Sequence, residues 1–465
     1  MIENVFPYRL HLTVFQLEGY SIKRFVRWIL LHPFTRKLET KKGLVWTFKS
    51  KFICFVAICL AVSFTIFLGN LFGVSGCILG IVVSTQSYLF LVCALLLLKP
   101  YELCNRCLVK RRIKRKIESL KLKGLKVIGI TGSYGKTSIK EVLYQLLKTK
   151  YSVLRTPESY NTLFGIEKVV DLELDDSYGY FICEMGAYKR GEIRELCDIV
   201  LPDYAILTGI NEQHVERFGS IQNTIKAKFE LIQAVNRGEA VFINGNDSVV
   251  AENFHKFISN PIIYGPKDSE FFVENVLVGK SGTTFTLQIN GKRMKCKTLL
   301  PSNGNLSNIL GAVSLSYNLG VKDEDIIRVI HNLKPIPHRL ELKGLNNGNY
   351  MIDNAYSSNT TGFMNALDFL RSLDADHKVL VTPGIVELGG LTKEVHLKLG
   401  AYAAGVCDMV ILVGKNERIR WLEEGINKKS KIIIINTISA LSSLIEKLNI
   451  KNSVILVEND LPENY

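Results

Sequence analysis

Apolar and polar positions divide the chain into stretches of different pattern. From Phe52 to Leu98 the residues are almost continuously apolar, with no charged side chain and no histidine. From about residue 124 onward, short β-branched apolar runs alternate with segments of helical periodicity, and a second alternation begins near residue 334. Alternating strands and helices favour a parallel sheet covered by helices on both faces. The pattern therefore predicts two α/β units behind an apolar segment.

The expected elements follow from these periods. The first alternation predicts strands in "LKVIGITG", "YGYFICEMG", "DYAILTGI" and "EAVFING", and helices near Ser138–Lys148, Glu192–Cys197 and Ile221–Asn236. The second predicts strands in "GNYMIDNAY", "HKVLVTPG", "DMVILVG", "KIIIIN" and "NSVILVEN", and helices near Thr361–Leu373 and Lys393–Gly405. We accordingly divide the chain into a basic amphipathic segment (1–51), an apolar hairpin (52–98), a basic helix (99–123), a central nucleotide-binding domain (124–333) and a smaller Rossmann-like α/β domain (334–465).

The apolar run is long enough to cross a membrane twice. One spanning helix needs about 20 apolar residues, so the run fits two spans with a turn near Gly69–Gly76. The alternative is a buried core helix, but such helices rarely continue so far without a charge. Basic residues on both sides favour an even number of crossings, with both ends and the catalytic domains cytoplasmic. The run starts too late and is too long for a cleaved signal peptide.

The net charge of +14 is concentrated in the N-terminal part of the chain. Residues 1–126 hold 21 Lys and Arg against 5 Asp and Glu, while the remainder holds 37 against 39. A nucleic-acid partner would require a basic catalytic body, so this composition argues against one. "YSIKRFVRWILLH" predicts a helix that lies at the membrane interface or packs on the hairpin. "KRRIKRKIESLKLKGLK" predicts a basic helix against anionic lipid.

The ten cysteines are scattered along the chain, and Cys104 and Cys107 form a lone C-x-x-C pair. A structural zinc site usually needs a second such pair or a histidine pair, and none follows at a suitable spacing. We therefore expect unpaired thiols in a reducing compartment.

The stretch "VIGITGSYGKTSIKE" (Val127–Glu141) predicts a phosphate-binding loop between a strand and a helix. Backbone N–H groups of a glycine turn at a helix N-terminus bind phosphate, helped by the helix dipole. Lys136 would reach the outer phosphates of a nucleotide, and the Thr137 hydroxyl would hold Mg²⁺. The predicted nucleotide-binding residues of the loop are Thr131, Gly132, Ser133, Tyr134, Gly135, Lys136, Thr137 and Ser138.

Three further polar residues follow the loop at places where chemistry is expected. Glu184 ends a strand beside the loop, where a carboxylate can bind Mg²⁺, although it could also be a structural acid. His214 follows a strand end and could be a metal ligand or a packed loop histidine. Lys228 lies on a predicted helix and on its own reads as a solvated surface lysine.

The loop spacing T-G-x-x-G-K-T resembles that of the Mur ligase family, the ATP-dependent amide-forming enzymes of peptidoglycan assembly. The resemblance continues from Gly124 to Leu456 and is greatest to the branch that adds D-alanyl-D-alanine. The segments that carry it are "SYNTLFGI" (Ser159–Ile166), "EMGAYKRGEI" (Glu184–Ile193), "LTGINEQHVERFGS" (Leu207–Ser220), "IKAKFELI" (Ile225–Ile232), "NLSN" (Asn305–Asn308), "PHRLE" (Pro337–Glu341) and "VELG" followed by His396.

The resemblance implies roles for individual residues. It implies catalytic roles for Lys136, Glu184, His214 and Lys228, and a metal site of two Mg²⁺ ions formed by Thr137, Glu184, His214 and Lys228, with Lys228 carbamylated. Asn305 and Asn308 look like adenine contacts, and Arg339 and Asp353 look like the residues that close over phosphate and ribose. The substrate-facing residues implied are Asn161, Thr162, Tyr356 and Asn359.

The resemblance also implies a reaction. ATP would phosphorylate an acceptor carboxylate, and an amino acid or dipeptide amine would attack the acyl phosphate to form an amide. The expected partners are a cell-wall precursor, which could be lipid-linked, and membrane lipid. A ligase with another acceptor, such as a glutamate-adding one, and a membrane scaffold that binds ATP without catalysis remain alternatives.

Several positions depart from the family pattern. The family's "D-D-x-Y-N-A-N-P" is "DNAYSSNT" (Asp353–Thr360) here, which questions D-alanyl-D-alanine as donor. Gly209 replaces an asparagine, and Gly304 replaces a histidine before the adenine-contacting Asn305. The C-terminal "VLVKGS" is "ILVEND" here, which removes a basic position near the donor site. The domain that grips the uridine nucleotide in soluble members of the branch is replaced by the basic segments and the apolar hairpin.

Overall fold

The computed structural model describes residues 7–32, 44–157, 160–301, 303–345, 348–356, 358–427, 429–437, 440–441, 444–445 and 451–459. The described chain divides into two compact units, which meet between Val109 and Lys110.

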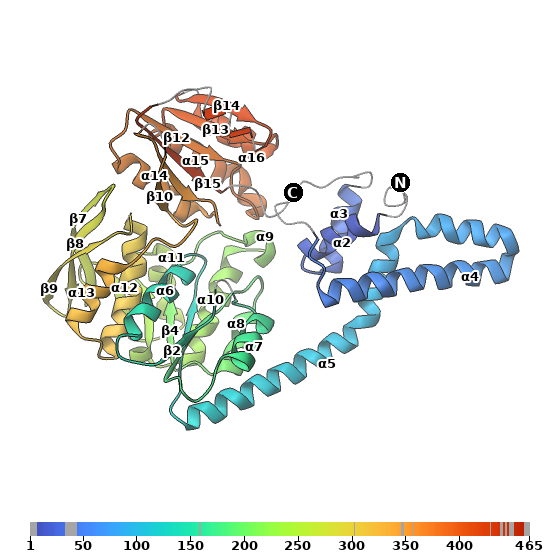
Figure 1. Ribbon diagram of the computed structural model, residues 1–465, viewed down its shortest axis with the longest axis horizontal. Coiled ribbons are helices and arrows are strands. Elements are labelled where there is room, and N and C mark those ends of the chain that lie inside the picture. Colours follow the sequence, from blue (N-terminus) through green and yellow to red (C-terminus); the bar gives the residue numbers. More distant parts are fainter. Residues whose placement is uncertain are drawn as a thin grey trace. The chain divides into compact units, whose positions relative to one another are not determined.

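The first unit contains four helices within its described residues: α2 (Tyr8–Leu17), α3 (Ile22–Leu31), α4 (Phe48–Ser84) and the first part of α5 (Ser87–Leu122) (Figure 1). Phe15 of α2 and Phe25 of α3 are fully buried in one cluster with Ile53 of α4 and Leu91 of α5. Of the two alternatives for "YSIKRFVRWILLH", the structure therefore favours packing on the apolar helices.

Helix α4 reverses direction at Gly73, whose φ of +65° lies in the left-handed region. The two legs then run side by side. A Cβ atom at Gly80 would lie 2.7 Å from the Cα atom of Thr65, and the hydroxyls of Thr65 and Ser84 are 3.4 Å apart. Small side chains let the two backbones approach closely. The predicted turn at Gly69–Gly76 is confirmed, whereas the return leg is interrupted at Thr85 and Gln86, between α4 and α5.

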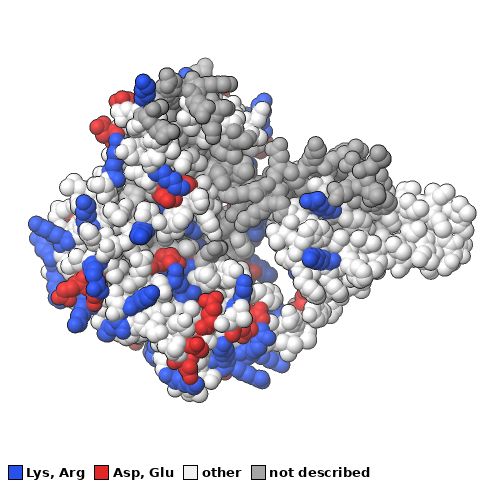
Figure 2. Space-filling model, in the orientation of Figure 1, with Lys and Arg blue, Asp and Glu red and all other residues white. Residues whose placement is uncertain are grey.

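Helices α4 and α5 are the ones among the described residues that are long and apolar enough to cross a membrane. Most of their apolar side chains are exposed in the folded chain, as Phe55 and Val74 illustrate at 64% and 78%. Figure 2 shows the projecting end of the α4 hairpin as a surface without Lys, Arg, Asp or Glu, and residues 52–84 contain none of these. An exposed apolar surface of this kind marks an interaction with lipid or protein.

The second unit begins with a sheet built around the phosphate loop. Its strands are β1 (Lys126–Thr131), β2 (Val153–Arg155), β3 (Tyr180–Glu184), β4 (Tyr204–Leu207), β5 (Val241–Asn244), β6 (Ile262–Gly265), β7 (Phe271–Gly279), β8 (Gly282–Ile289) and β9 (Lys292–Thr298). Within the described residues their order is β2-β3-β1-β4-β5-β6-β7-β8-β9. Pairing is parallel from β2 to β7 and antiparallel from β7 to β9.

Helices cover both faces of this sheet because strands of a parallel sheet are apolar on both sides. Ile128 and Ile130 of β1 pack with α6 (Lys136–Leu147), α12 (Asn303–Asn318) and α13 (Asp323–Asn332). Gly129, which points the other way, approaches Leu231 of α10. The remaining helices of this part are α7 (Leu163–Leu172), α8 (Glu192–Val200), α9 (Val215–Phe218), α10 (Ile221–Val235) and α11 (Ser248–Asn253).

A second sheet forms the C-terminal part of the unit. Its strands are β10 (Glu341–Gly344), β11 (Tyr350–Asn354), β12 (His377–Thr382), β13 (Met409–Val413), β14 (Lys431–Ile435) and β15 (Ser453–Glu458), in the order β10-β11-β15-β12-β13-β14. All described pairs are parallel except β10 with β11. Helices α14 (Thr360–Ser372), α15 (Thr392–Ala404) and α16 (Glu417–Ile426) share one core with one face of this sheet.

The basic residues after Val109 differ in role from the prediction. We expected them to lie against anionic lipid, but several pair with the body of the second unit. Arg112 pairs with Glu167 and Asp171 of α7, and Lys116 donates to the carbonyl oxygen of Val170 at 2.6 Å. Further along the helix, Lys121 lies 2.7 Å from Asp203. Fully buried Ile113 and Ile117 lie on the same part of α5. The last turns of α5 are therefore an integral part of the α/β body.

We predict that reversing two of these charges loosens the end of α5. The double variant Arg112→Glu/Lys116→Glu loses its ion pairs and places an anion at the C-terminal carbonyls of α7. Hydrogen exchange of the amides of residues 110–122 should become about tenfold faster, which corresponds to about 1.4 kcal/mol.

The matched control is Arg111→Glu/Arg115→Glu, which makes the same change in net charge at two exposed positions of the same turns. Equal exchange in the two double variants would contradict this assignment.

Candidate functional site

The phosphate loop joins the end of β1 to the start of α6. Gly135 precedes α6 with a φ of +77°, and a Cβ atom there would lie 2.5 Å from the side-chain oxygen of Asn308. Glycine is needed at this position for both reasons. The Lys136 ammonium donates to the carbonyl oxygens of Gly132, at 2.7 Å, and Ser133, at 3.3 Å. Burial lowers the pKa of Lys136, against the opposing effect of Glu184.

Glu184 ends β3 with only 1% of its surface exposed, and it is surrounded by donors. The Thr137 hydroxyl donates to one carboxylate oxygen at 3.0 Å, and the Lys140 ammonium lies at the same distance from that oxygen. The Asn161 amide donates to the other oxygen at 3.1 Å. Burial alone would raise the pKa of Glu184, but Lys140, Lys136 and these hydrogen bonds together lower it. The carboxylate therefore stays ionised beside the phosphate loop.

Lys140 was not among the predicted site residues, although its place on α6 indicates that it is buried. Lys140 follows Lys136 by one helical turn, so both lie on the same face of α6. A lysine placed among Ile139, Val142 and Leu143 is buried with them, and burial of an ammonium requires an anionic partner. The sequence also missed Glu387 and Asp247, which are described below.

His214 contacts a residue of the C-terminal domain. Its Nδ1 atom contacts the Glu387 carboxylate, which also pairs with Arg217. Burial would raise the pKa of Glu387, but His214 and Arg217 together lower it to about 2. Since Nδ1 is occupied, Nε2 is the nitrogen of His214 left for a metal or substrate. The prediction that His214 acts as a metal ligand stays a prediction.

Lys228 of α10 is 3% exposed, so the surface position that its pattern suggested on its own is wrong. Among the described residues it forms no ion pair, and its ammonium lies 5.7 Å from the ring centre of Phe218. Burial, followed by repulsion from Lys136, brings its pKa well below the ordinary value for lysine. The neutral amine is the nucleophilic form of lysine, and the lowered pKa favours that form.

Two contacts join the C-terminal domain to the side of the middle domain that carries the phosphate loop. The Asn211 amide donates to the side-chain oxygen of Asn359 at 2.8 Å, and that oxygen also caps α14 through the N–H of Gly362. The Arg339 guanidinium lies 3.5 Å from the Thr137 hydroxyl and over the ring of Tyr356, 4.5 Å from its centre. The domain boundary therefore lies directly over the loop.

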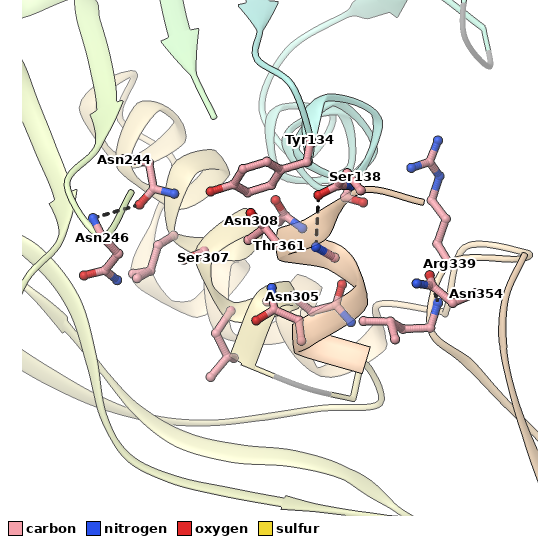
Figure 3. Close-up of a pocket in the computed structure, with 18 of the residues that line it drawn as sticks. Tyr134, Ser138, Asn244, Asn246, Asn305, Ser307, Asn308, Arg339, Asn354 and Thr361 are labelled. Atoms are coloured by element: carbon pink, nitrogen blue, oxygen red, sulfur yellow. Dashed lines mark hydrogen bonds between the residues drawn. The ribbon is translucent and has the colours of Figure 1, made fainter. Parts of the chain in front are cut away.

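A cavity of about 510 Å³ opens between these elements (Figure 3). Its lining comes from the phosphate loop, the β5–α11 turn, β7, α12 and the C-terminal domain. Of the predicted nucleotide contacts, it contains Tyr134, Gly135, Ser138, Asn305, Asn308 and Arg339. The structure thus brings together, around one cavity, residues that lie more than 200 positions apart.

Other predicted contacts are placed less favourably. Thr131 is fully buried and its hydroxyl donates to the carbonyl oxygen of Met185 at 2.9 Å, so its side chain does not fit a nucleotide contact. The Asp353 carboxylate pairs with Lys343, at 2.6 Å, and with His338, at 2.9 Å, so it is not available to bind a ribose. Thr162 is exposed at the start of α7 and makes no side-chain cap there. Ser159 of the "SYNTLFGI" segment and Ser357 lie outside the described residues.

Two of the departures from the family pattern contact each other. Glu458 at the end of β15 is fully buried, and its two carboxylate oxygens accept hydrogen bonds from the Asn354 amide and the Ser358 hydroxyl, both at 2.6 Å. Burial raises the pKa of Glu458 to about 7, although both hydrogen bonds oppose the rise. The segment between β11 and α14 is thereby fixed to the end of the neighbouring strand.

Comparison with known protein families identifies two regions of the chain. Residues 130–316 match the Mur ligase middle domain, and residues 338–458 match the Mur ligase glutamate ligase domain. The chain is 30% identical over 296 residues to the UDP-N-acetylmuramoyl-tripeptide–D-alanyl-D-alanine ligase of Escherichia coli K12, covering 62% of this chain and 65% of that protein. It is 29% identical to the enzyme of the same name from Bacillus subtilis 168, covering 63% of each. The chain thus spans slightly less than two thirds of these relatives.

Solved structures show the same fold. MurF of Acinetobacter baumannii superposes with a TM-score of 0.69 at 24% identity, covering 76% of this chain and 77% of that one. MurF of Thermotoga maritima in complex with ADP superposes with a TM-score of 0.68 at 24% identity, covering 76% and 80%.

We predict that Glu458 makes the stability of the C-terminal domain depend on pH. Its folded pKa of about 7 lies above the ordinary 4.5, so the folded state binds more protons between these values. The free energy of unfolding should therefore fall as pH rises from about 5 to 8, by about 3 kcal/mol for this group. Glu458→Gln should remove this part of the dependence, measured by pulse proteolysis in urea at pH 5 and pH 8.

The control is Glu424→Gln, at an exposed position of α16, which should keep the wild-type dependence. If Glu458→Gln retains that dependence too, the buried carboxyl does not titrate as assigned.

Proposed function

We propose that this chain, which belongs to the Mur ligase family through its middle and C-terminal domains, is an ATP-dependent ligase that forms an amide bond in cell-wall precursor synthesis. The observation that carries the proposal is the ionised, buried Glu184 beside a lysine-containing phosphate loop. A binding module needs a loop that holds phosphate, but it does not need a buried carboxylate kept ionised next to it.

The first step activates the acceptor. ATP binds with its phosphates on the N–H groups at the start of α6, and Lys136 turns from the loop carbonyls to the outer phosphates. An acceptor carboxylate oxygen attacks the γ-phosphorus, the bond to the β-phosphate oxygen breaks and ADP leaves. Lys136 and Arg339 supply positive charge where negative charge gathers on the transferring group.

The side chains fit a divalent cation at this position. The Thr137 hydroxyl and Glu184 carboxylate are hard oxygen ligands 3.0 Å apart. No group of three or more His, Cys, Asp or Glu side chains that could hold a metal is found in the described residues, so nucleotide oxygens and water would complete the coordination. This is the usual manner of Mg²⁺ binding. When bound, Mg²⁺ supplies charge neutralisation and orientation of the phosphates.

Lys228 supports a second cation position. Its neutral amine can add to CO₂ with loss of a proton, which turns a buried amine into a carboxylate ligand. Burial without an ion pair among the described residues is costly for an ammonium, and a carbamate on Lys228 would offer an anionic oxygen ligand to a second Mg²⁺. Burial, opposed by Glu387, lowers the pKa of His214, which favours the neutral imidazole that a cation can bind.

The second step forms the amide. The incoming amine attacks the carbonyl carbon of the acyl phosphate, and inorganic phosphate leaves with its bonding electron pair while the amine loses a proton. Water would compete at this carbon. The contacts Asn211–Asn359 and His214–Glu387 join the C-terminal domain to the loop side of the middle domain, and closure of that domain over the acyl phosphate would exclude water.

The relatives' names suggest the substrates. They point to a UDP-N-acetylmuramoyl-tripeptide as acceptor and D-alanyl-D-alanine as the incoming amine. We propose an acceptor and donor of these classes for this chain. The Asn354–Glu458–Ser358 contacts favour a donor that differs in detail from D-alanyl-D-alanine, because the basic position of the family pattern is an acid here.

We further propose that catalysis takes place at the cytoplasmic face of the cell membrane on a lipid-linked acceptor. The support for this is the α4 hairpin, which carries no charged residue after Lys51, and its exposed apolar surface. The alternatives are a related ligase of the glutamate-adding type and an ATP-binding membrane scaffold. The ionised Glu184 and the buried Lys228 argue against the scaffold.

Lys136→Ala should abolish amine-dependent release of phosphate from ATP, by at least about 100-fold, because the charge on the transferring group is no longer neutralised. The measurement is phosphate release by purified protein offered muramoyl-peptide precursors and a panel of amino acids and dipeptides, with products identified by mass. Lys148→Ala, an exposed lysine at the end of α6, is the control and should turn over like wild type. Undiminished turnover in Lys136→Ala would refute the ligase assignment.

A second measurement addresses the acceptor. Purified protein in lipid vesicles should ligate a lipid-linked muramoyl-peptide at least about tenfold more efficiently, in kcat/KM, than the soluble nucleotide-linked form of the same peptide. The expected reason is that the membrane concentrates enzyme and acceptor on one surface. Equal efficiency with both acceptors would remove the lipid-linked proposal and leave the ligase assignment intact.

A further inference from the structure

Tyr134 holds an unusual position in the phosphate loop. Its half-buried ring lines the 510 Å³ cavity, and in Figure 3 it lies between Asn244 and Asn308. Its hydroxyl donates to an Asp247 carboxylate oxygen at 2.6 Å. An aromatic ring therefore extends from the phosphate loop to the β5–α11 turn, along one wall of the cavity.

Asp247 is a fixed anchor for the ring. The oxygen that accepts from Tyr134 also accepts from the backbone N–H of Ile210 at 3.1 Å. The other oxygen caps α11 by accepting from the N–H of Val250 at 2.8 Å. Because the carboxylate is held by two backbone donors, it restricts where the Tyr134 hydroxyl, and hence the ring, can lie.

Gly209 makes room for this ring. A Cβ atom built on Gly209 would overlap the hydroxyl-bearing end of the Tyr134 ring and lie 2.7 Å from its Cε1 atom. Any side chain at position 209 would therefore displace the ring. The family pattern has asparagine there, so the glycine and the tyrosine form a matched pair in this chain.

The opposite change is found elsewhere in the same cavity. Gly304 stands where the family pattern has a histidine, and it lines the cavity next to Asn305. Compared with the family pattern, the cavity thus lacks an imidazole ring at position 304, while the Tyr134 ring lines another wall. The cavity begins at the phosphate loop, so it offers room for the ribose and base of a nucleotide whose phosphates would rest on that loop.

We propose that Tyr134 contacts the ribose and base of the nucleotide and selects a nucleoside phosphate over bare polyphosphate. The proposal rests on the proposed ATP-dependent function. The flat ring offers the nucleoside an apolar contact of the kind that aromatic side chains give to bases. Anchoring by Asp247 orders the ring before the nucleotide arrives, which lowers the entropic cost of binding.

The test is calorimetric binding of ADP and of inorganic tripolyphosphate to the full-length protein in detergent with Mg²⁺. Tyr134→Ser should weaken ADP binding about tenfold and leave tripolyphosphate binding within about twofold of wild type. Tyr134→Phe keeps the ring and should bind ADP within about threefold of wild type. Unchanged ADP affinity in Tyr134→Ser, or equal losses for both ligands, would overturn the proposal.

Gly209→Asn supplies a second, independent arm. It leaves Tyr134 in the chain but displaces its ring, so it should weaken ADP binding about as much as Tyr134→Ser. The double variant Gly209→Asn/Tyr134→Ser should bind ADP no more weakly than either single variant, and additive losses would contradict the pairing. Thermal unfolding of each variant verifies that it folds. If wild type binds ADP but forms no amide, the proposed function fails while the Tyr134 assignment stands.

Discussion

Glu184 has to remain ionised while almost completely removed from water, and the elements around the site are arranged to meet that condition. Desolvating a carboxylate costs several kcal/mol, which only paired charge and hydrogen bonds recover. Lys140 and Thr137 come from one face of α6, and Asn161 comes from the loop before α7. These three contacts fix the rotation of α6 on the sheet, and thereby the place where the phosphate loop presents Lys136.

The C-terminal domain is tied to the same elements. Arg339 reaches Thr137, which itself donates to Glu184, and Asn359 both caps α14 and accepts from Asn211. Glu387 joins this contact set through His214 and Arg217. A displacement of the C-terminal domain would therefore disturb polar groups at the phosphate loop. Domain position and the electrostatics of the site are coupled by shared residues.

The sequence predicted β1, β3, β4 and β5 and the C-terminal strands β11 to β15, because buried parallel strands have a characteristic apolar composition. It did not predict the short strands β2, β6 and β10, or the helices α7, α12, α13 and α16. It missed β7 to β9, whose alternating polar residues, as in "KRMKCKT", have no more apolar character than a surface loop. It misread the basic end of α5 because a run of lysines does not reveal whether its partners are lipids or carboxylates of α7. It missed Lys140 because the charge that compensates it is 44 positions away.

The departures from the family pattern distinguish a remodelled site from a decayed one. In a site released from selection, substitutions would accumulate without regard to each other and leave cavities or unpaired buried charges. Here Gly209 fits the Tyr134 ring, and the buried Glu458 receives hydrogen bonds from Asn354 and Ser358. A buried carboxylate without those donors would destabilise β15, and a side chain at position 209 would push the ring from Asp247. The substituted residues therefore compensate one another in groups that are in contact. This is expected of a working site adapted to a somewhat different substrate, and it argues against a scaffold that has lost catalysis.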